Sequence, residues 1–122
     1  MGNERQTLGK QGEDLAAEYL QKKGYRILQR NFRCRRGELD LVALQGRTLV
    51  FVEVKTRRGL QFGEPREAVT QTKQQHLLQG AAYYCKLQGE SGMEKRMDVV
   101  EVLFLEGKPY LRHTENAFSE RR

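Results

Sequence analysis

The segment from Leu39 to Lys55 constrains the fold most, because it is the most apolar part of the chain and carries a single turn signal, Gln45-Gly46-Arg47. Two runs of alternating side chains meet at this turn, a pattern typical of a β-hairpin. One face of the predicted hairpin has Leu39, Leu41 and Ala43 against Val50, Val52 and Val54. The other face is also apolar near the turn. A sheet that is apolar on both faces is usually covered on both sides, so we expect this hairpin at the centre of the fold.

Charged residues occupy the open end of the second face. With Gly46-Arg47 as the loop, Asp40 lies opposite Glu53 and Glu38 lies opposite Lys55. Two facing carboxylates repel each other, and burying them without partners costs roughly several kcal/mol. Lys55 offsets one negative charge, and a bound divalent cation would offset the rest. The pattern therefore favours a metal site over an edge-strand acid pair bridged to Lys55.

The rest of the chain predicts two helices and further strands around the hairpin. Helices are expected over 7–23 and 72–87, strands over 25–32 and 96–105, a short edge strand over 110–112, a loop over 56–64 and a helical turn at Pro65. The order is helix, three strands, helix, strand, which predicts an α/β domain with a central mixed sheet flanked by helices. We expect residues 1–122 to form a single domain, with flexible ends at about 1–6 and 119–122.

Composition and residue usage exclude several classes of protein. Lys and Arg exceed Asp and Glu by 22 to 16, so the net charge is +6 and a polyanionic partner is favoured. No apolar run approaches the roughly 20 residues of a membrane span, and the first residues lack the hydrophobic core of a signal peptide. Cys34, Cys85, His76 and His113 are scattered and match no zinc pattern. We expect a cytoplasmic protein with reduced thiols, surface histidines and no membrane partner.

Two acids outside the hairpin are further candidates. Glu13 falls on the inward stripe of the first helix, beside small alanines that would let the helix approach Asp40 and Glu53. A glutamate near a helix start can instead complement the helix dipole, so both interpretations stay open. Asp98 alternates with Val100 in the last long strand. For Asp98 a structural bridge to an arginine is favoured over metal binding.

Motifs in a fixed order indicate a family. They are Gly12-Glu13, Asn31-Phe32-Arg33, Gly37-Glu38-Leu39-Asp40-Leu41-Val42, Phe51-Val52-Glu53-Val54-Lys55-Thr56-Arg57, Lys73, Arg96-Met97-Asp98-Val99-Val100 and Asn116-Ala117-Phe118. In these motifs the chain resembles the YraN family, bacterial proteins assigned as endonucleases related to archaeal Holliday-junction resolvases in the PD-(D/E)XK nuclease superfamily. The departures are Leu39 and Val42 where isoleucines are common and Met97 where phenylalanine is usual. The resemblance runs from about Gly9 to Phe118 and implies a restriction-endonuclease-like αβββαβ core.

The resemblance also implies a Mg²⁺ or Mn²⁺ site. Asp40 and Glu53, with the main-chain carbonyl of Val54, would bind the metal, because such hard cations prefer oxygen ligands. Glu13 would help to hold the metal, directly or through water. Lys55 would orient or deprotonate the attacking water, or stabilise the charge that develops on the phosphate. These residues would be the catalytic set.

Basic residues near the acids would contact phosphates. The predicted nucleic-acid-binding residues are Arg33, Arg35, Arg36, Arg57, Arg58 and, by the resemblance, Lys73. Glu38 keeps two open roles, as a further metal ligand or as the ion-pair partner of Lys55 or Arg36.

Two functional hypotheses follow from these expectations. The first is a metal-dependent endonuclease that hydrolyses DNA, either nonspecifically or selectively on branched DNA such as Holliday junctions, as a homodimer by analogy with resolvases. The second is a nuclease-fold module that binds DNA and recruits repair or recombination proteins without cutting. No recognition-helix or zinc-finger pattern is present, so sequence-specific readout of bases is not expected.

Overall fold

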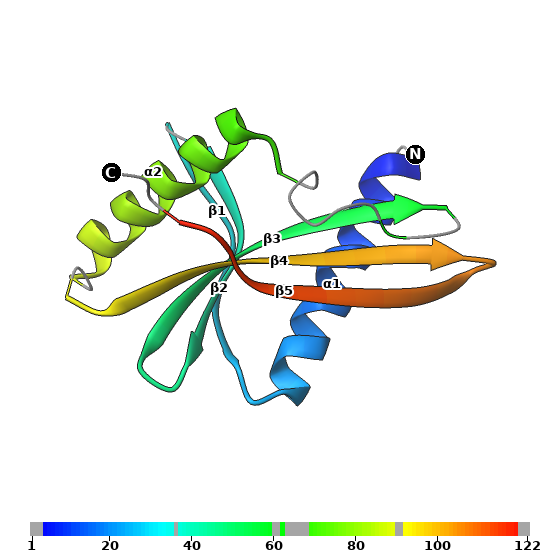
Figure 1. Ribbon diagram of the computed structural model, residues 1–122, viewed down its shortest axis with the longest axis horizontal. Helices are drawn as coiled ribbons and strands as arrows, with labels where there is room; N and C mark the ends of the chain where they lie inside the picture. Colours follow the sequence, from blue (N-terminus) through cyan, green and yellow to red (C-terminus); the bar gives the residue numbers. More distant parts are fainter. Residues whose placement is uncertain (1–3, 36, 60–61, 63–68, 90–91, 120–122) are drawn as a thin grey trace.

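The protein is an α/β fold in which a five-stranded mixed sheet has one helix on each face (Figure 1). A computed structural model describes residues 4–35, 37–59, 62, 69–89 and 92–119. The elements are α1 (Glu4–Lys22), β1 (Arg26–Cys34), β2 (Gly37–Gln45), β3 (Thr48–Arg58), α2 (Gln71–Gln88), β4 (Glu94–Leu105) and β5 (Lys108–Phe118). The predicted αβββαβ order and the restriction-endonuclease-like fold class are confirmed, with β5 added at the end.

The strands follow one another across the sheet in chain order, β1-β2-β3-β4-β5. Only β3 and β4 are parallel, because α2 crosses over between them, and every other neighbouring pair is antiparallel. The predicted edge strand over 110–112 is part of a much longer strand, β5, which returns along β4 through the turn at Glu106-Gly107. The sheet thus puts β2 and β3, which carry the acidic residues, in its interior.

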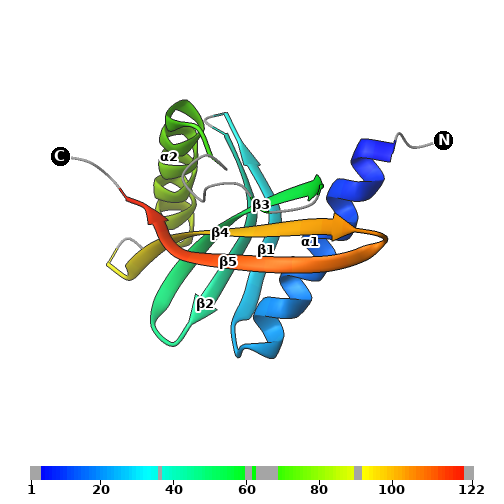
Figure 2. The same cartoon turned by 45° about the vertical axis from the view of Figure 1, so that its right-hand side comes forward.

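Helix α1 packs closely on one face of the sheet (Figure 2). Its small residues Ala16 and Ala17 and the fully buried Leu20 pack against β2, β3 and β4. Gly12 makes the closest approach, since a Cβ built at this position would lie 1.9 Å from Oγ1 of Thr56. The helix ends before Gly24, whose φ of 94° is a left-handed conformation that favours glycine. This close packing brings the start of α1 to the end of β3.

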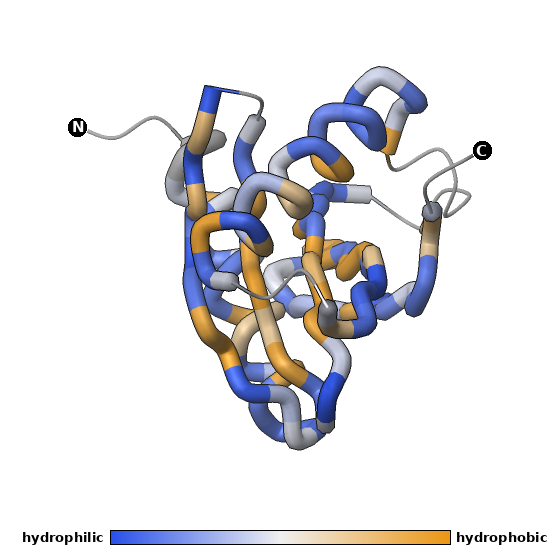
Figure 3. Tube along the Cα trace, turned by 90° about the vertical axis from the view of Figure 1, so that its left-hand side faces the viewer, coloured by the Kyte–Doolittle hydropathy of each residue, from blue (hydrophilic) through white to orange (hydrophobic). Residues whose placement is uncertain are grey.

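Helix α2 covers the opposite face of the sheet. The hydroxyl of Thr70 caps its first turn by accepting a hydrogen bond from the Lys73 N–H at 3.2 Å, and Gly89 ends it in a left-handed conformation. Its buried residues are Leu77, Gly80, Ala81, Tyr84 and Cys85. They pack on strand residues that include Phe51 and Val99. Apolar segments run along the strands between the helices, as the hydropathy colouring in Figure 3 shows.

The predicted hairpin register is confirmed near the turn and ends before the acidic residues. Pairs run from Gln45–Thr48 to Leu41–Val52, where the ladder between β2 and β3 stops. The expectation that Leu39 shares a face with Leu41 is wrong, because Leu39 packs in the α2 core beside Phe32 while Leu41 packs under α1. Beyond the last pair β2 separates from β3, so strict alternation across the hairpin no longer applies.

Some predictions fall outside the described residues. Arg36, the turn at Pro65 and residues 60, 61, 63 and 64 of the expected loop lie there, as do residues 1–3 and 120–122 of the expected flexible ends. The start of the loop expected over 56–64 is wrong, because β3 continues through Arg58. Residues 4–6 are helical, since α1 begins at Glu4. In the described part of the chain neither helix is long and apolar enough to cross a membrane.

Candidate functional site

Asp40 lies where β2 leaves β3 and is the centre of the candidate site. Its Oδ2 accepts a hydrogen bond from the Val54 N–H at 2.8 Å, which gives this strand amide a side-chain acceptor beyond the end of the ladder. Burial, a hydrogen bond with Glu53 and the charge of Glu53 raise the pKa of Asp40 from 3.8 to about 8. At neutral pH and without a cation, Asp40 therefore keeps its proton.

Glu53 is almost completely buried and incompletely paired. Only 5% of the residue is exposed, yet its Oε2 has no hydrogen-bond partner. Nζ of Lys73, near the start of α2, lies 3.7 Å from this oxygen, an ion-pair distance that is too long for a good hydrogen bond. The side chain of Lys73 is 41% exposed. Lys73 thus connects the buried carboxylate to the surface.

Glu13 reaches the same region from α1. Burial and then the charge of Asp40 raise the pKa of Glu13, while a hydrogen bond from Asn31 lowers it. The charge of Glu38 raises the pKa of Glu13 further. Acids from α1, β2 and β3 thus interact electrostatically with one another. The close contact of Gly12 with Thr56 is the packing feature that makes this approach possible.

Glu38 and Lys55 do not face each other as the sequence had suggested. Glu38 pairs with Arg33 of β1, whose Nε lies 3.6 Å from Oε1 of Glu38, because β2 is paired with β1 rather than β3 at this point. Lys55 follows Glu53 on the same face of β3, and within the described residues it forms no ion pair. Its ammonium group is available to a ligand of the site.

Glu101 is a buried acid that sequence reasoning missed. It lies on β4 next to Lys55 in the parallel register, and only 1% of it is exposed. Arg112 of β5 binds its Oε1 at 2.7 Å through Nη2, whereas its Oε2 has no hydrogen-bond partner. The available signal was a single charge inside the apolar run Val99–Leu103.

Four of the six predicted basic residues line two separate grooves. Arg57 and Arg58 line a groove of about 580 Å³ together with Glu13, Val54 and the start of α1. Arg33 and Arg35 line a different groove, between the end of β1 and the end of α2. Asp40 is on β2, which lies between the two strands, β1 and β3, that contribute to these grooves. The basic residues thus occur on two sides of the acids.

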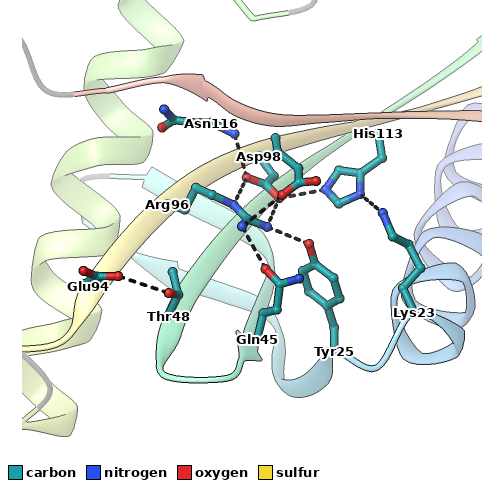
Figure 4. A network of polar contacts seen from close by, with 10 residues as sticks. Lys23, Tyr25, Gln45, Thr48, Glu94, Arg96, Asp98, His113 and Asn116 are labelled. Atoms are coloured by element: carbon teal, nitrogen blue, oxygen red, sulfur yellow. Dashed lines mark hydrogen bonds and ion pairs between the residues drawn. The ribbon is translucent and has the colours of Figure 1, made fainter.

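Asp98 belongs to a separate structural network (Figure 4). Burial opposes ionisation, but hydrogen bonds from His113, Arg96 and the Asn116 N–H leave the pKa of Asp98 below its ordinary value. Arg96 binds both carboxylate oxygens at 2.8 Å, so the predicted arginine bridge is confirmed. The expectation of a surface His113 is wrong, because its side chain is only 2% exposed and packs edge-on against Tyr19 while it contacts Asp98. The network joins β4 to β5.

The acidic residues fit a hard cation as a partial ligand set. Glu53 supplies an unpaired buried oxygen, and Asp40 carries a carboxyl that needs either a proton or a cation at neutral pH. No three Asp, Glu, His or Cys side chains of the described residues form a complete metal-ligand cluster. This is compatible with Mg²⁺, which usually binds one or two carboxylates and completes its octahedron with water and substrate phosphates.

Comparisons with known proteins agree with the resemblance seen in the motifs. A protein-family model, described as Uncharacterised protein family UPF0102, matches residues 12–102 of this chain, and this range includes the acids of the site. A UPF0102 protein of Caldicellulosiruptor saccharolyticus is 55% identical over 98 residues, covering 80% of this chain and 83% of its own length. One from Syntrophomonas wolfei is 51% identical over 111 residues, covering 91% and 96%. The chain therefore belongs to the UPF0102 family, which is the YraN family.

Proposed function

We propose that this protein is a metal-dependent endonuclease that hydrolyses phosphodiester bonds in DNA. The observation that carries the proposal is that the partly or fully buried carboxyl groups of Glu13, Asp40 and Glu53 interact with one another, while one oxygen of Glu53 has no hydrogen-bond partner. A purely structural acid pair would be expected to have its hydrogen bonds satisfied, because an unpaired buried carboxylate oxygen is costly. These acids are paired incompletely and lie beside lysines and arginines. That combination suits a site that binds a cation and a phosphate.

Mg²⁺ or Mn²⁺ would be held by carboxylate oxygens of Asp40 and Glu53 and by the carbonyl of Val54, with Glu13 contributing directly or through water. A bound cation of this kind supplies a Lewis acid that polarises the scissile phosphate and lowers the pKa of water. The role of the protein is to fix the oxygen donors on three elements. The Val54 N–H, bonded to Oδ2 of Asp40, holds this carboxylate in place.

Two lysines have distinct positions in the proposed reaction. Lys55 is on the face of β3 that carries Glu53 and is free to orient or deprotonate the attacking water, or to stabilise charge on the phosphate. Lys73 is paired with Glu53 at 3.7 Å and is partly exposed, so it can turn from this carboxylate to a phosphate oxygen when a cation is bound. By analogy with the superfamily, the products would be a 5′-phosphate and a 3′-hydroxyl.

The DNA backbone would be held through Arg57 and Arg58, which share a groove with Glu13. Phosphate contacts of this kind carry no sequence information, so the enzyme would act nonspecifically or on branched DNA such as Holliday junctions. A homodimer, with two such sites, would suit a four-way junction. A cytoplasmic location would put the enzyme with its DNA.

The proposal is tested with the purified full-length protein and synthetic duplex, single-stranded, flap and four-way-junction DNA, in Mn²⁺, Mg²⁺ or EDTA. We expect metal-dependent cutting that Lys55→Ala reduces at least about 100-fold, within the range for loss of a group that acts on the transition state. Lys108→Ala, an exposed lysine in β5, is the matched control and should cut normally. Binding of DNA without cutting in any metal would instead support the recruiting module.

A further inference from the structure

A second groove lies beside the acidic site, between the end of β1 with its following turn and the last turns of α2. Its volume is about 610 Å³, and it is lined by Phe32, Arg33, Cys34, Arg35, Tyr83, Lys86 and Leu87. The two sides come from segments about fifty residues apart in the chain, joined by the packing of α2 on the sheet. The endonuclease proposal uses none of the α2 residues of this groove.

The charge of the groove is positive. Three of its lining residues are cationic, Arg33, Arg35 and Lys86, and none of its described lining residues is acidic. Arg33 is paired with Glu38 of β2 at its edge. Arg35 and Lys86 are exposed and form no ion pair with any described residue. Free cations in a groove without acids favour an anionic occupant.

The groove also contains exposed apolar side chains, which distinguishes it from a surface patch that is only basic. Tyr83 is 41% exposed and Leu87, one turn later on α2, is 56% exposed, although the next residue after Tyr83, Tyr84, is buried in the core. The ring of Tyr83 lies 6.4 Å from that of Phe32 and is tilted by 37°. An exposed ring among cations suits a strand whose bases are unpaired, because the ring can stack on a base while the cations bind phosphates. A duplex hides its base faces from such a ring.

The groove is next to the proposed cleavage site. Arg33, on its edge, is the register partner of Glu38, and Asp40 is two residues further along β2, a separation of about 7 Å in a strand. We propose that this groove binds the single-stranded arm of a DNA substrate, so that cutting takes place where duplex meets an unpaired strand. The location of the cut rests on the proposed endonuclease function, whereas binding of the unpaired strand does not.

Binding is measured by fluorescence anisotropy in EDTA, which keeps it independent of cleavage. The probes are one labelled oligonucleotide as a single strand, as a blunt duplex and as the arm of a flap. We expect Tyr83→Ala to weaken binding of the single strand and the flap about 5- to 150-fold, the range for loss of one stacked base, with less than about a twofold change for the duplex. Tyr83→Phe should retain binding, because the ring remains.

The matched control is Tyr110→Ala, since Tyr110 is 48% exposed on β5 and is not part of the groove. It should bind all three probes like the unmodified protein. An equal effect of Tyr83→Ala on single strand and duplex would overturn the proposal, as would no effect at all or failure of the unmodified protein to bind single strands. If binding of the single strand depends on Tyr83 but the protein never cuts DNA, the proposed binding groove is supported and the endonuclease proposal is contradicted.

A second readout uses the thiol inside the groove. Cys34 lines the groove and is partly exposed, whereas Cys85 is 1% exposed and serves as the internal control. We expect the single-stranded oligonucleotide to slow alkylation of Cys34 by iodoacetamide, and the duplex to leave its rate unchanged. Unchanged alkylation of Cys34 at saturating single strand would contradict occupation of this groove.

Discussion

The acids of the site are individually unfavourable for folding. Asp40 is partly buried and needs a proton or a cation at neutral pH, and Glu53 and Glu101 each have one buried oxygen without a hydrogen bond. A partly satisfied polar network in a low-dielectric interior is less stable than an apolar core of the same shape. Such local conflicts concentrate at functional sites, where a ligand supplies the missing interactions. The free protein should therefore be stabilised by removal of one acid.

Asp40→Asn provides the test. The pKa of Asp40 is raised from 3.8 to about 8, so the native state binds more protons than the unfolded state between these values. The contribution of protonated Asp40 to the free energy of unfolding is therefore fully present below about pH 4, and it is lost as the pH rises toward 8, where the native carboxyl group ionises. In EDTA, Asp40→Asn should unfold like the unmodified protein near pH 4 and be more stable at pH 8 by roughly several kcal/mol, since each unit of pKa difference corresponds to about 1.4 kcal/mol.

Thermal unfolding at several pH values measures this difference. Asp14→Asn, an exposed aspartate on α1, is the matched control and should not reproduce the gain at pH 8. Mn²⁺ should raise the Tm of the unmodified protein at pH 8 and leave that of Asp40→Asn nearly unchanged. Parallel pH profiles of the Asp40→Asn and unmodified proteins would contradict the proposed protonation of Asp40.

At the scale of elements, the seating of α1 on β3 decides whether Glu13 reaches the site. Gly12 and Thr56 are in contact where α1 meets β3, so a larger residue at position 12 would push the two elements apart. Gly9, three residues earlier on the same helix, has open space where its Cβ would be. The two glycines therefore respond oppositely to the same substitution.

Gly9→Ala should stabilise the protein by up to about 1 kcal/mol, because alanine is the better helix former. Gly12→Ala should destabilise it by about 1–3 kcal/mol, since the added methyl overlaps Thr56. If the endonuclease proposal is correct, Gly12→Ala should also lose activity as Glu13 moves away, while Gly9→Ala stays active. Urea unfolding gives both changes in stability, and equal effects of the two substitutions would disprove close helix–strand packing.

At the scale of the whole molecule, the net charge is +6, and part of the positive charge lies on strands that flank Asp40. Arg57 and Arg58, the last residues of β3, line one groove. Arg33, near the end of β1, and Arg35, just after it, line the other, and β2 with its Asp40 lies between these strands. The end of β1, the start of β2 and the end of β3 lie at the same end of the sheet, so a polyanion bound to these arginines would lie near the candidate cation site. The electrostatic part of its affinity should then depend on salt.

The double variant Arg57→Ala/Arg58→Ala should bind duplex DNA more weakly and with a flatter salt dependence. Each lost phosphate contact lowers the magnitude of the slope of log K against log salt by about 0.9, so two contacts lower it by about 1.8. Arg47→Ala, in the hairpin turn at the opposite end of β3, is the control and should retain the slope. Titrations at several salt concentrations measure it, and an unchanged slope in the double variant would exclude this groove as the DNA path.

The sequence by itself determined the order of the helices and of the first four strands, the central hairpin with its register near the turn, and the family, but not the full length of β5. These follow from local signals, namely the period of side-chain alternation, the turn at Gly46 and the spacing of Asp40, Glu53 and Lys55. Even the bridge between Arg96 and Asp98 was predictable, because residues two apart on a strand share a face. Such signals are contained within short segments.

Only the tertiary structure decided how distant segments meet. The ladder between β2 and β3 ends at the pair Leu41–Val52. Beyond this pair Leu39 packs in the core under α2, and Glu38 forms its ion pair with Arg33 instead of Lys55. The burial of His113, the orphaned oxygen of Glu101 and the aromatic groove at Tyr83 are likewise outcomes of packing between elements. Local periodicity states which face a residue prefers, but twist, strand separation and helix seating determine what lies on that face.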